Sequence, residues 1–258
     1  MSTQIEYKMK DGNRIPALGL GTWTLRGEEC IQVVKTALKL GYRHLDTAEM
    51  YGNQKDIGEA LKGFDRSKVF ITSKVPREEL HYDDMIKACD KTLADLKTSY
   101  VDLYLIHWPN ALIPLEETFR AFQKLLKDSK IRSVGVSNFP IDLLKEALRI
   151  TKVPITVDQV EFHPQSYKKE LLEFCKENGI VLTAYSPLGR GRLLQNEVIV
   201  NAAEKYKRTP SQVCLRWSLQ KGVVVIPRSG SENHLKENLD IFNWRLADED
   251  MRKIDSLT

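Results

Sequence analysis

The sequence predicts a single-domain α/β fold, a (β/α)8 barrel with an N-terminal β-hairpin, over residues 1–258. Eight short runs rich in Val, Ile and Leu have the composition of parallel strands buried on both faces. Segments with helical periodicity separate these runs, and strand starts recur at roughly 25–40 residue intervals, as repeated βαβ units require. No linker or composition shift marks a second domain, and 258 residues is an ordinary length for one barrel.

The elements follow one another in regular order along the chain. An opening hairpin is expected from "IEYKMK", the turn "DGN" and "RIPAL". The eight barrel strands are then expected at residues 17–21, 42–46, 68–74, 101–107, 131–137, 155–162, 180–186 and 222–229.

Two of the intervening segments carry clear helix signals. In "LEETFRAFQKLL", the apolar residues Leu115, Phe119 and Phe122 are spaced as on one face of a helix. Thr209 precedes Pro210 with Gln212 three residues later, which predicts a capping box with proline at the first helical position.

An open doubly wound sheet is the main alternative fold. It would bind a dinucleotide through GxGxxG after its first strand, but "GLGTWT" has only Gly19 and Gly21 and lacks the third glycine. Eight βα repeats in one domain favour the closed barrel.

Composition and charge limit the partners and the compartment. The net charge of +4 is too small to indicate nucleic acid binding, and no run resembles a signal peptide or a membrane span. The cysteines lie far apart on expected helices without a CxxC pair, which favours buried free thiols over a metal site; they are Cys30, Cys89, Cys175 and Cys214. We therefore expect a cytoplasmic protein without a metal or a membrane.

The residues at the ends of the eight strands are the candidate functional residues, because such barrels carry their chemistry at this edge. In strand order these residues are Gly21, Thr22, Trp23, Asp46, Tyr51, Lys74, His107, Trp108, Ser137, Asn138, Gln159, Tyr185, Ser186, Arg228 and Ser229. Each has a structural alternative, since a lone histidine or amide often only completes a hydrogen bond. Together they are difficult to attribute to packing.

Four of these residues suggest proton delivery to a carbonyl oxygen. A buried lysine needs an anion, and Asp46 on the adjacent strand is the expected partner of Lys74. An ammonium beside Tyr51 would lower the pKa of the phenol, so that Tyr51 donates a proton while His107 orients the substrate oxygen. No serine or cysteine nucleophile and no metal triad is evident, so a cofactor is expected to supply the electrons.

The sequence as a whole resembles the aldo-keto reductases. The segments that carry the resemblance are "GYRHLDTAEMYGN", "VDLYLIHWP", "KIRSVGVSNF", "ITVDQVEFHP", "LTAYSPLG" and "IPRSGSENHLKEN". They run in the family's order from about residue 4 to residue 256. The resemblance implies a (β/α)8 barrel that reduces aldehydes and ketones with NADPH, without metal or flavin.

The resemblance also implies roles for individual residues. Asp46, Tyr51, Lys74 and His107 match the catalytic tetrad, with Tyr51 as general acid. Residues that match the cofactor site are Gly21, Thr22, Ser137, Asn138, Gln159, Tyr185, Ser186, Leu188, Gly189, Arg228, Ser229, His234, Glu237 and Asn238. The substrate pocket is expected to be lined by Trp23, Met50, Trp108 and Phe139 beside Tyr51.

Three positions differ from the residues that the family commonly has. Arg228 replaces a lysine and could still grip a 2′-phosphate. His234 replaces an arginine, so a permanent charge is lost, and NADH remains open beside the favoured NADPH. Gln54 replaces a glutamate, to which we attach little functional weight.

The resemblance further predicts a monomer with a shallow, open pocket that accepts several small carbonyl compounds. The cofactor-covering loop is short, and the chain ends at "RKIDSLT" without the tail of many larger members. Compact microbial reductases of keto-sugars and reactive aldehydes are the nearest type. Two alternatives remain: a non-catalytic NADPH-binding member of the same fold, and another barrel chemistry such as sugar-phosphate isomerisation.

Overall fold

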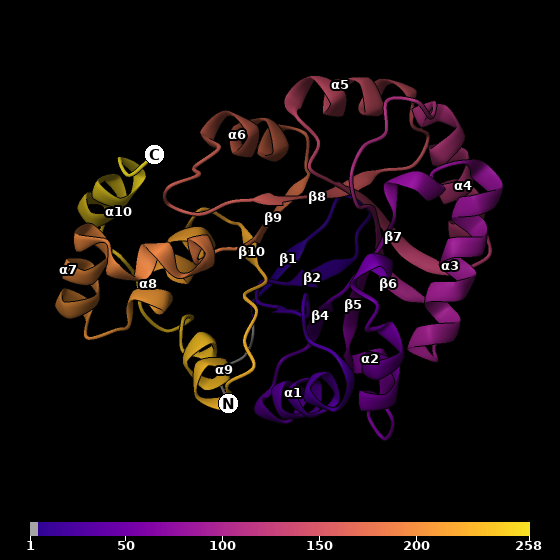
Figure 1. Cartoon of the computed structure of the whole chain (residues 1–258). Coiled ribbons are helices and arrows are strands. Elements are labelled where there is room, and N and C mark those ends of the chain that lie inside the picture. Colours follow the sequence, from indigo (N-terminus) through magenta and orange to yellow (C-terminus); the bar gives the residue numbers. More distant parts are fainter. Residues whose placement is uncertain (1–4) are drawn as a thin grey trace.

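The computed structural model describes residues 5–258 and contains an eight-stranded parallel sheet and a separate hairpin. The sheet strands follow one another in chain order (Figure 1). They are β3 (Leu20–Gly21), β4 (His44–Asp46), β5 (Phe70–Val75), β6 (Val101–Ile106), β7 (Ile131–Ser137), β8 (Ile155–Glu161), β9 (Val181–Tyr185) and β10 (Val224–Val225). Each lies within or next to a segment expected from the sequence.

The first and last strands meet and close the sheet into a barrel. Leu18 forms a parallel bridge with Val225. The Gly19 amide donates to the Val225 carbonyl at 2.9 Å, and the Val225 amide donates to the Ala17 carbonyl at 2.9 Å. The predicted (β/α)8 barrel is therefore confirmed.

The two glycines of "GLG" are explained by this closure. A Cβ on Gly19 would lie 2.6 Å from His44 Nδ1, and one on Gly21 would lie 2.6 Å from the Ile226 carbonyl oxygen. Gly19 thus leaves room for the His44 ring, and Gly21 leaves room for the backbone that follows β10.

The N-terminal hairpin pairs β1 (Glu6–Lys8) with β2 (Arg14–Pro16) in antiparallel register, as expected from the sequence. Its Met9 and Ile15 join a buried cluster with the barrel residues Leu103, Leu105 and Val157. The hairpin thus packs on the interior of the barrel.

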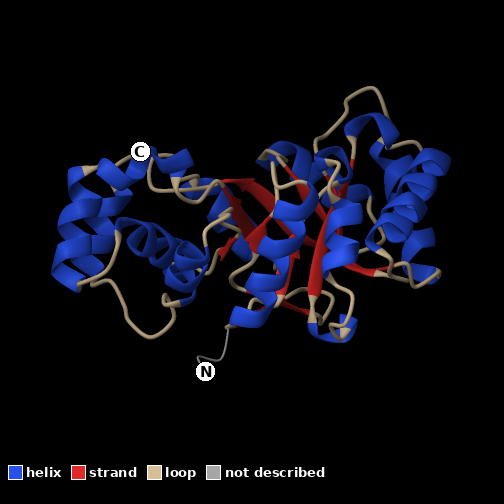
Figure 2. Ribbon diagram, turned by 60° about the horizontal axis from the view of Figure 1, so that its bottom comes forward, coloured by secondary structure: helices blue, strands red, loops and turns tan. Residues whose placement is uncertain are grey.

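Helices surround the strands, as the blue ribbons around the red ones show in Figure 2. They are α1 (Gly27–Leu40), α2 (Gln54–Ala60), α3 (Tyr82–Leu96), α4 (Leu115–Lys127), α5 (Ile141–Ile150), α6 (Lys169–Glu177), α7 (Glu197–Tyr206), α8 (Pro210–Gln220), α9 (Glu232–Leu239) and α10 (Asp248–Asp255). Two short 3-10 segments, η1 (Glu49–Tyr51) and η4 (Gly189–Gln195), matter for the site.

The two helix signals in the sequence are confirmed. Leu115, Phe119 and Phe122 of α4 are buried in the core. Helix α8 begins with Thr209 as its N-cap, and its capping box with Gln212 is complete.

The four cysteines are buried free thiols on helices, as expected. Burial raises the pKa of all four thiols, which makes them poor nucleophiles. In residues 5–258, every helix is too short or too polar to span a bilayer.

Candidate active site

A buried ion pair forms the centre of the site. Asp46 ends β4 and Lys74 lies near the end of β5, so the parallel pairing of the two strands brings the side chains together. Lys74 Nζ donates to Asp46 Oδ1 at 2.6 Å, and the two side chains are 0% and 2% exposed. The sequence-based expectation that Asp46 is the partner of Lys74 agrees with this geometry.

The lysine and the aspartate have further partners that make their burial tolerable. Lys74 Nζ also donates to the Thr47 carbonyl at 2.9 Å and to Tyr51 Oη at 3.3 Å. The second Asp46 oxygen accepts a 2.7 Å bond from Gln159 Nε2. Burial lowers the pKa of Lys74, but Asp46 and Tyr51 outweigh burial and the pKa lies above its ordinary value. Lys74 is therefore charged at neutral pH.

The pKa of Tyr51 differs from the simplest expectation. Burial is the largest influence and raises the pKa, while the Lys74 ammonium lowers it by a smaller amount, so the pKa lies above the ordinary value of 10.0. The ammonium alone predicts a lowered pKa for Tyr51, but desolvation of the phenol has the larger effect. In the free protein Tyr51 is thus a protonated phenol, with its proton beside a fixed positive charge.

His107 follows β6 and packs edge-on against Tyr51, with ring centroids 5.7 Å apart. Burial, aided by the Lys74 charge, lowers the pKa of His107 to about 3. Its Nδ1 is buried without a hydrogen-bond partner among residues 5–258. At neutral pH the ring is therefore uncharged and carries one N–H.

The backbone of Tyr51 is held by contacts that the sequence argument did not identify. Arg26 donates to the Tyr51 carbonyl, and Lys91 of α3 pairs with Glu49 at the start of η1. Gly52 follows with φ +66, and a Cβ there would meet Arg26 Nη1 at 2.8 Å. A glycine after a tyrosine in a short turn is the signal that could have suggested this close approach.

A second hydrogen-bond network joins the ends of β7, β8 and β9. Ser137 Oγ donates to the Gln159 carbonyl at 2.7 Å, and Asn138 Nδ2 donates to Ser137 Oγ at 3.0 Å and to the His107 carbonyl at 3.2 Å. Tyr185 Oη donates to Asn138 Oδ1 at 3.0 Å. Asn138 adopts a left-handed backbone with φ 63, a conformation that asparagine tolerates better than most residues.

These groups surround one cavity of about 310 Å³, which we call the central pocket. The predicted site residues that line it are Gly21, Thr22, Trp23, Asp46, Met50, Tyr51, His107, Trp108, Ser137, Asn138, Gln159, Tyr185, Ser186 and Arg228. Lys74 lies behind Asp46 and Tyr51. Arg190 and Ile226 also line the pocket and were missed, since neither is itself a polar strand-end residue.

Phe139 does not line the central pocket. Its side chain is 1% exposed and borders a separate cleft beside it. The expectation failed because the residue after the left-handed Asn138 turns away from its predecessor, and sequence position alone does not reveal this direction.

The remaining predicted cofactor residues lie outside the central pocket. Leu188 and Gly189 lead into η4, and His234 is exposed on α9. Ser229 Oγ accepts a 3.1 Å bond from the Ser231 amide at the start of α9. Helix α9 begins after Ser231, which is its N-cap residue.

Two of these residues already have partners within the protein. Glu237 accepts a bond from Thr209 at the cap of α8, and Asn238 is 3% exposed and forms a hydrogen bond with the Tyr42 hydroxyl. Gln54, the unusual residue after "YGN", is 2% exposed and bonds Thr92 and Ser73, which is a packing role.

Comparison with known proteins identifies the family. Residues 17–258 match the model of the aldo/keto reductase family. Glyoxal reductase of Bacillus subtilis is 47% identical over 253 residues, which cover 97% of this chain and 91% of the relative.

Solved structures similar to this chain belong to the same family. A thermostable aldo-keto reductase in complex with the inhibitor epalrestat is 43% identical with a TM-score of 0.95, and the match covers 98% of this chain and 100% of that one. An aldo-keto reductase complexed with NADPH is 30% identical with a TM-score of 0.94, over 99% and 88% of the two chains. The chain therefore belongs to the aldo/keto reductase family and is an oxidoreductase that uses a nicotinamide cofactor.

Proposed function

We propose that the protein reduces small aldehydes and ketones to alcohols, with NADPH as hydride donor and Tyr51 as proton donor. The observation that carries this proposal is the position of Lys74, whose ammonium lies 2.6 Å from Asp46 Oδ1 and 3.3 Å from Tyr51 Oη. A buried charge directly behind a pocket tyrosine is suited to stabilising a phenolate as it forms.

The central pocket fits a nicotinamide. Gln159 uses its Nε2 for Asp46, which leaves its Oε1 to accept from a carboxamide. Ser137 and Asn138 add polar atoms beside it, and Tyr185 offers a half-buried ring for stacking. When bound, such a cofactor supplies a hydride to the carbonyl carbon.

Tyr51 gives its proton to the carbonyl oxygen as that oxygen gains negative charge. The phenolate left behind lies beside Lys74, and Asp46 and Gln159 keep the ammonium in place. Because the pKa of Tyr51 is raised in the free protein, the tyrosine carries its proton throughout the neutral pH range.

His107 is proposed to orient the carbonyl as an uncharged hydrogen-bond donor. With a pKa of about 3, the ring does not compete with Tyr51 as an acid at neutral pH. Its packing against the Tyr51 ring fixes the angle between the two groups.

NADPH is favoured over NADH by the cations near the pocket. Arg228 and Arg190 line it, and a guanidinium can bind a 2′-phosphate through two hydrogen bonds. His234 lies exposed at the start of α9 without a permanent charge. We expect His234→Arg to raise the NADPH to NADH preference by about fivefold, the size of one exposed ion pair. Comparable binding of NADH and NADPH by the wild type would contradict the role given to Arg228.

The substrate class follows from the pocket rim and from the relatives. Trp23, Met50 and Trp108 are 59%, 62% and 45% exposed, which suits an open pocket that admits several small carbonyl compounds. The similarity to glyoxal reductase supports reactive aldehydes and dicarbonyls, with keto-sugars as a second class. We also infer a cytoplasmic monomer, in keeping with four buried free thiols.

Steady-state reduction of glyoxal, simple aldehydes and keto-sugars with NADPH and NADH tests the proposal, with Tyr51→Phe as the matched variant. Tyr51→Phe should bind NADPH like the wild type but lose roughly 10²–10⁴ in kcat, because only the proton donor is removed. Unchanged turnover in Tyr51→Phe would show that another group is the acid.

A further inference from the structure

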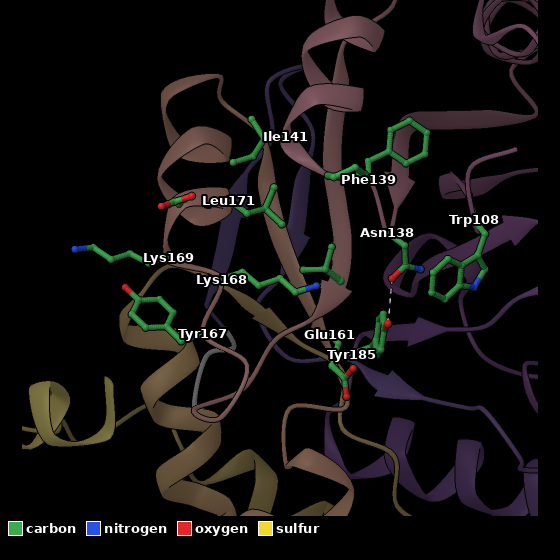
Figure 3. A pocket seen from close by; sticks show the side chains of 13 residues that line it. Trp108, Asn138, Phe139, Ile141, Glu161, Tyr167, Lys168, Lys169, Leu171 and Tyr185 are labelled. Carbon is green, nitrogen blue, oxygen red and sulfur yellow. Dashed lines mark hydrogen bonds between the residues drawn. The ribbon is translucent and has the colours of Figure 1, made fainter. Parts of the chain in front are cut away.

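A second cavity of about 770 Å³, here called the side cleft, adjoins the central pocket (Figure 3). Trp108, Asn138 and Tyr185 line both cavities. The hydrogen bond from Tyr185 to Asn138, drawn as a dashed line in Figure 3, therefore lies at their junction. A substrate with its carbonyl in the central pocket can extend past this junction into the side cleft.

Two of the proposed cofactor contacts, Asn138 and Tyr185, lie at this junction, and the other proposed cofactor contacts leave the side cleft free. Ser137 and Gln159, which are assigned to the nicotinamide carboxamide, line only the central pocket. The Arg190 and Arg228 cations also belong to the central pocket alone. The side cleft therefore remains available to the part of the substrate that does not react.

The walls of the side cleft suit an apolar chain. Ile141 comes from the start of α5, Val160 from β8 and Leu171 from the first turn of α6. Side chains from three separate elements thus form one apolar surface, and burying alkyl groups on it stabilises a ligand by about 0.8 kcal/mol per CH₂.

One cation points into this apolar surface. Lys168 is the N-cap residue of α6, and its exposed side chain runs into the cleft in Figure 3, whereas the neighbouring Lys169 extends away. Within residues 5–258, no hydrogen bond or ion pair holds the Lys168 ammonium, although its charge acts on Asp158 and His163. In the described part of the chain no side chain caps the first turn of α6, so its free amides add to the local positive potential.

Two carboxylates also line the side cleft, and they limit its preference for anions. Glu161 has a partner, His163 Nε2, at 3.6 Å, and Glu170 lies in the first turn of α6. The charged residues of the lining therefore balance in number. Selectivity depends on the position of Lys168 and not on a general positive field.

We propose that the side cleft binds the distal half of substrates in which an apolar chain joins the carbonyl to a carboxylate, with Lys168 pairing with that carboxylate. This substrate class rests on the proposed reductase function. The carbonyl lies at Tyr51 and His107, the chain lies on Ile141, Val160 and Leu171, and the charged end is held at the start of α6.

A series of ω-oxo acids of increasing chain length, each compared with the n-alkanal of equal length, tests the proposal. For the wild type, kcat/KM for the acid is divided by kcat/KM for the alkanal of equal length. This ratio should reach a maximum of about fivefold at one chain length, because the acid has the lower KM there. In Lys168→Ala the maximum should disappear, while Lys168→Arg should keep it. Lys169→Ala is the matched control and should leave the ratio unchanged.

Several outcomes would overturn the assignment. One is a wild-type ratio of kcat/KM, acid over alkanal, that has no maximum at any chain length. Another is a maximum that survives in Lys168→Ala. The third is an equal decrease of this ratio in the Lys168 and Lys169 variants. If no aldehyde of either series is reduced, the proposed function has failed. Calorimetric binding of the matching dicarboxylic acids to wild type and Lys168→Ala then decides the cleft assignment separately.

Discussion

The two sides of the central pocket differ in how firmly their side chains are held. On the β4 and β5 side, Asp46 and Lys74 are 2% and 0% exposed and bond each other and their neighbours. On the rim, Trp23 and Met50 are 59% and 62% exposed. The proposed reactive groups are thus fixed by buried polar contacts, whereas the proposed substrate contacts come from side chains with little support. We expect substitutions on the first side to affect catalysis and stability together, and substitutions on the rim to affect substrate binding alone.

The largest effect is expected for Lys74→Met. Removing the ammonium leaves the phenolate of Tyr51 without its stabilising charge, and kcat should fall by roughly 10²–10⁴. Among residues 5–258 it also leaves the buried Asp46 with Gln159 as its one side-chain partner, so the free energy of unfolding should drop by about 3–5 kcal/mol. Stopped-flow reduction and urea unfolding measure the two losses.

The double variant Asp46→Asn/Lys74→Met separates stability from chemistry. It removes the unpaired charge, so it should regain part of the lost stability and remain as inactive as Lys74→Met. Recovery of activity in the double variant would contradict a catalytic role for the lysine charge.

A second buried carboxyl on the same barrel provides a contrast to Asp46. Asp158 on β8 is 0% exposed, and no hydrogen bond of normal geometry reaches either of its oxygens from residues 5–258. Burial raises its pKa well above the ordinary value, despite the nearby Phe139 amide and Lys168. Burial thus favours the neutral form of Asp158, while Asp46 is paired with Lys74.

Asp158→Asn should therefore stabilise the protein by about 1–3 kcal/mol at neutral pH. Above pH about 4, ionisation of Asp158 lowers the free energy of the unfolded state but not that of the folded state. The free energy of unfolding of the wild type therefore falls as pH rises. Asparagine does not ionise, so the variant avoids this loss of unfolding free energy. Below pH about 4 the variant should therefore be no more stable than the wild type. Thermal unfolding across that pH range is the measurement, and a gain that persists in acid would refute the explanation.

A smaller effect is expected on the rim. Trp23→Ala should raise KM for small aldehydes by roughly threefold to tenfold while kcat and the unfolding midpoint stay close to wild type. Phe139→Leu is the matched contrast, since Phe139 is 1% exposed and lies outside the central pocket. It should cost about 1 kcal/mol of stability and leave KM for small aldehydes unchanged. Reversed results would show that the wrong aromatic residue was assigned to the pocket.

The proximity of the side chains on the firmly held side of the pocket could be predicted from the sequence. Strand ends in a parallel barrel must meet at one edge, so Asp46, Lys74 and His107 could be placed together from their strand positions alone. The direction of the Phe139 side chain depends on the left-handed turn at Asn138 and was not predictable in the same way.

Burial was the quantity that the sequence did not provide. The direction of the Tyr51 pKa depends on how much water the fold removes from the phenol. The partners of Glu237 and Asn238 depend on how α9 packs against α8 and Tyr42. Arg190 enters the pocket only because η4 folds with a left-handed backbone at that residue, φ 56.

The pH dependence of kcat in both directions tests the central claim most directly. Reduction needs the protonated Tyr51, and alcohol oxidation needs its phenolate. With the pKa of Tyr51 above 10.0 and that of His107 about 3, reduction should be constant from about pH 6 to about pH 9 and alcohol oxidation should rise with pH over that range. A loss of reduction with a midpoint near about 6.5, or an oxidation rate independent of pH, would contradict the assignment of Tyr51 as the proton donor.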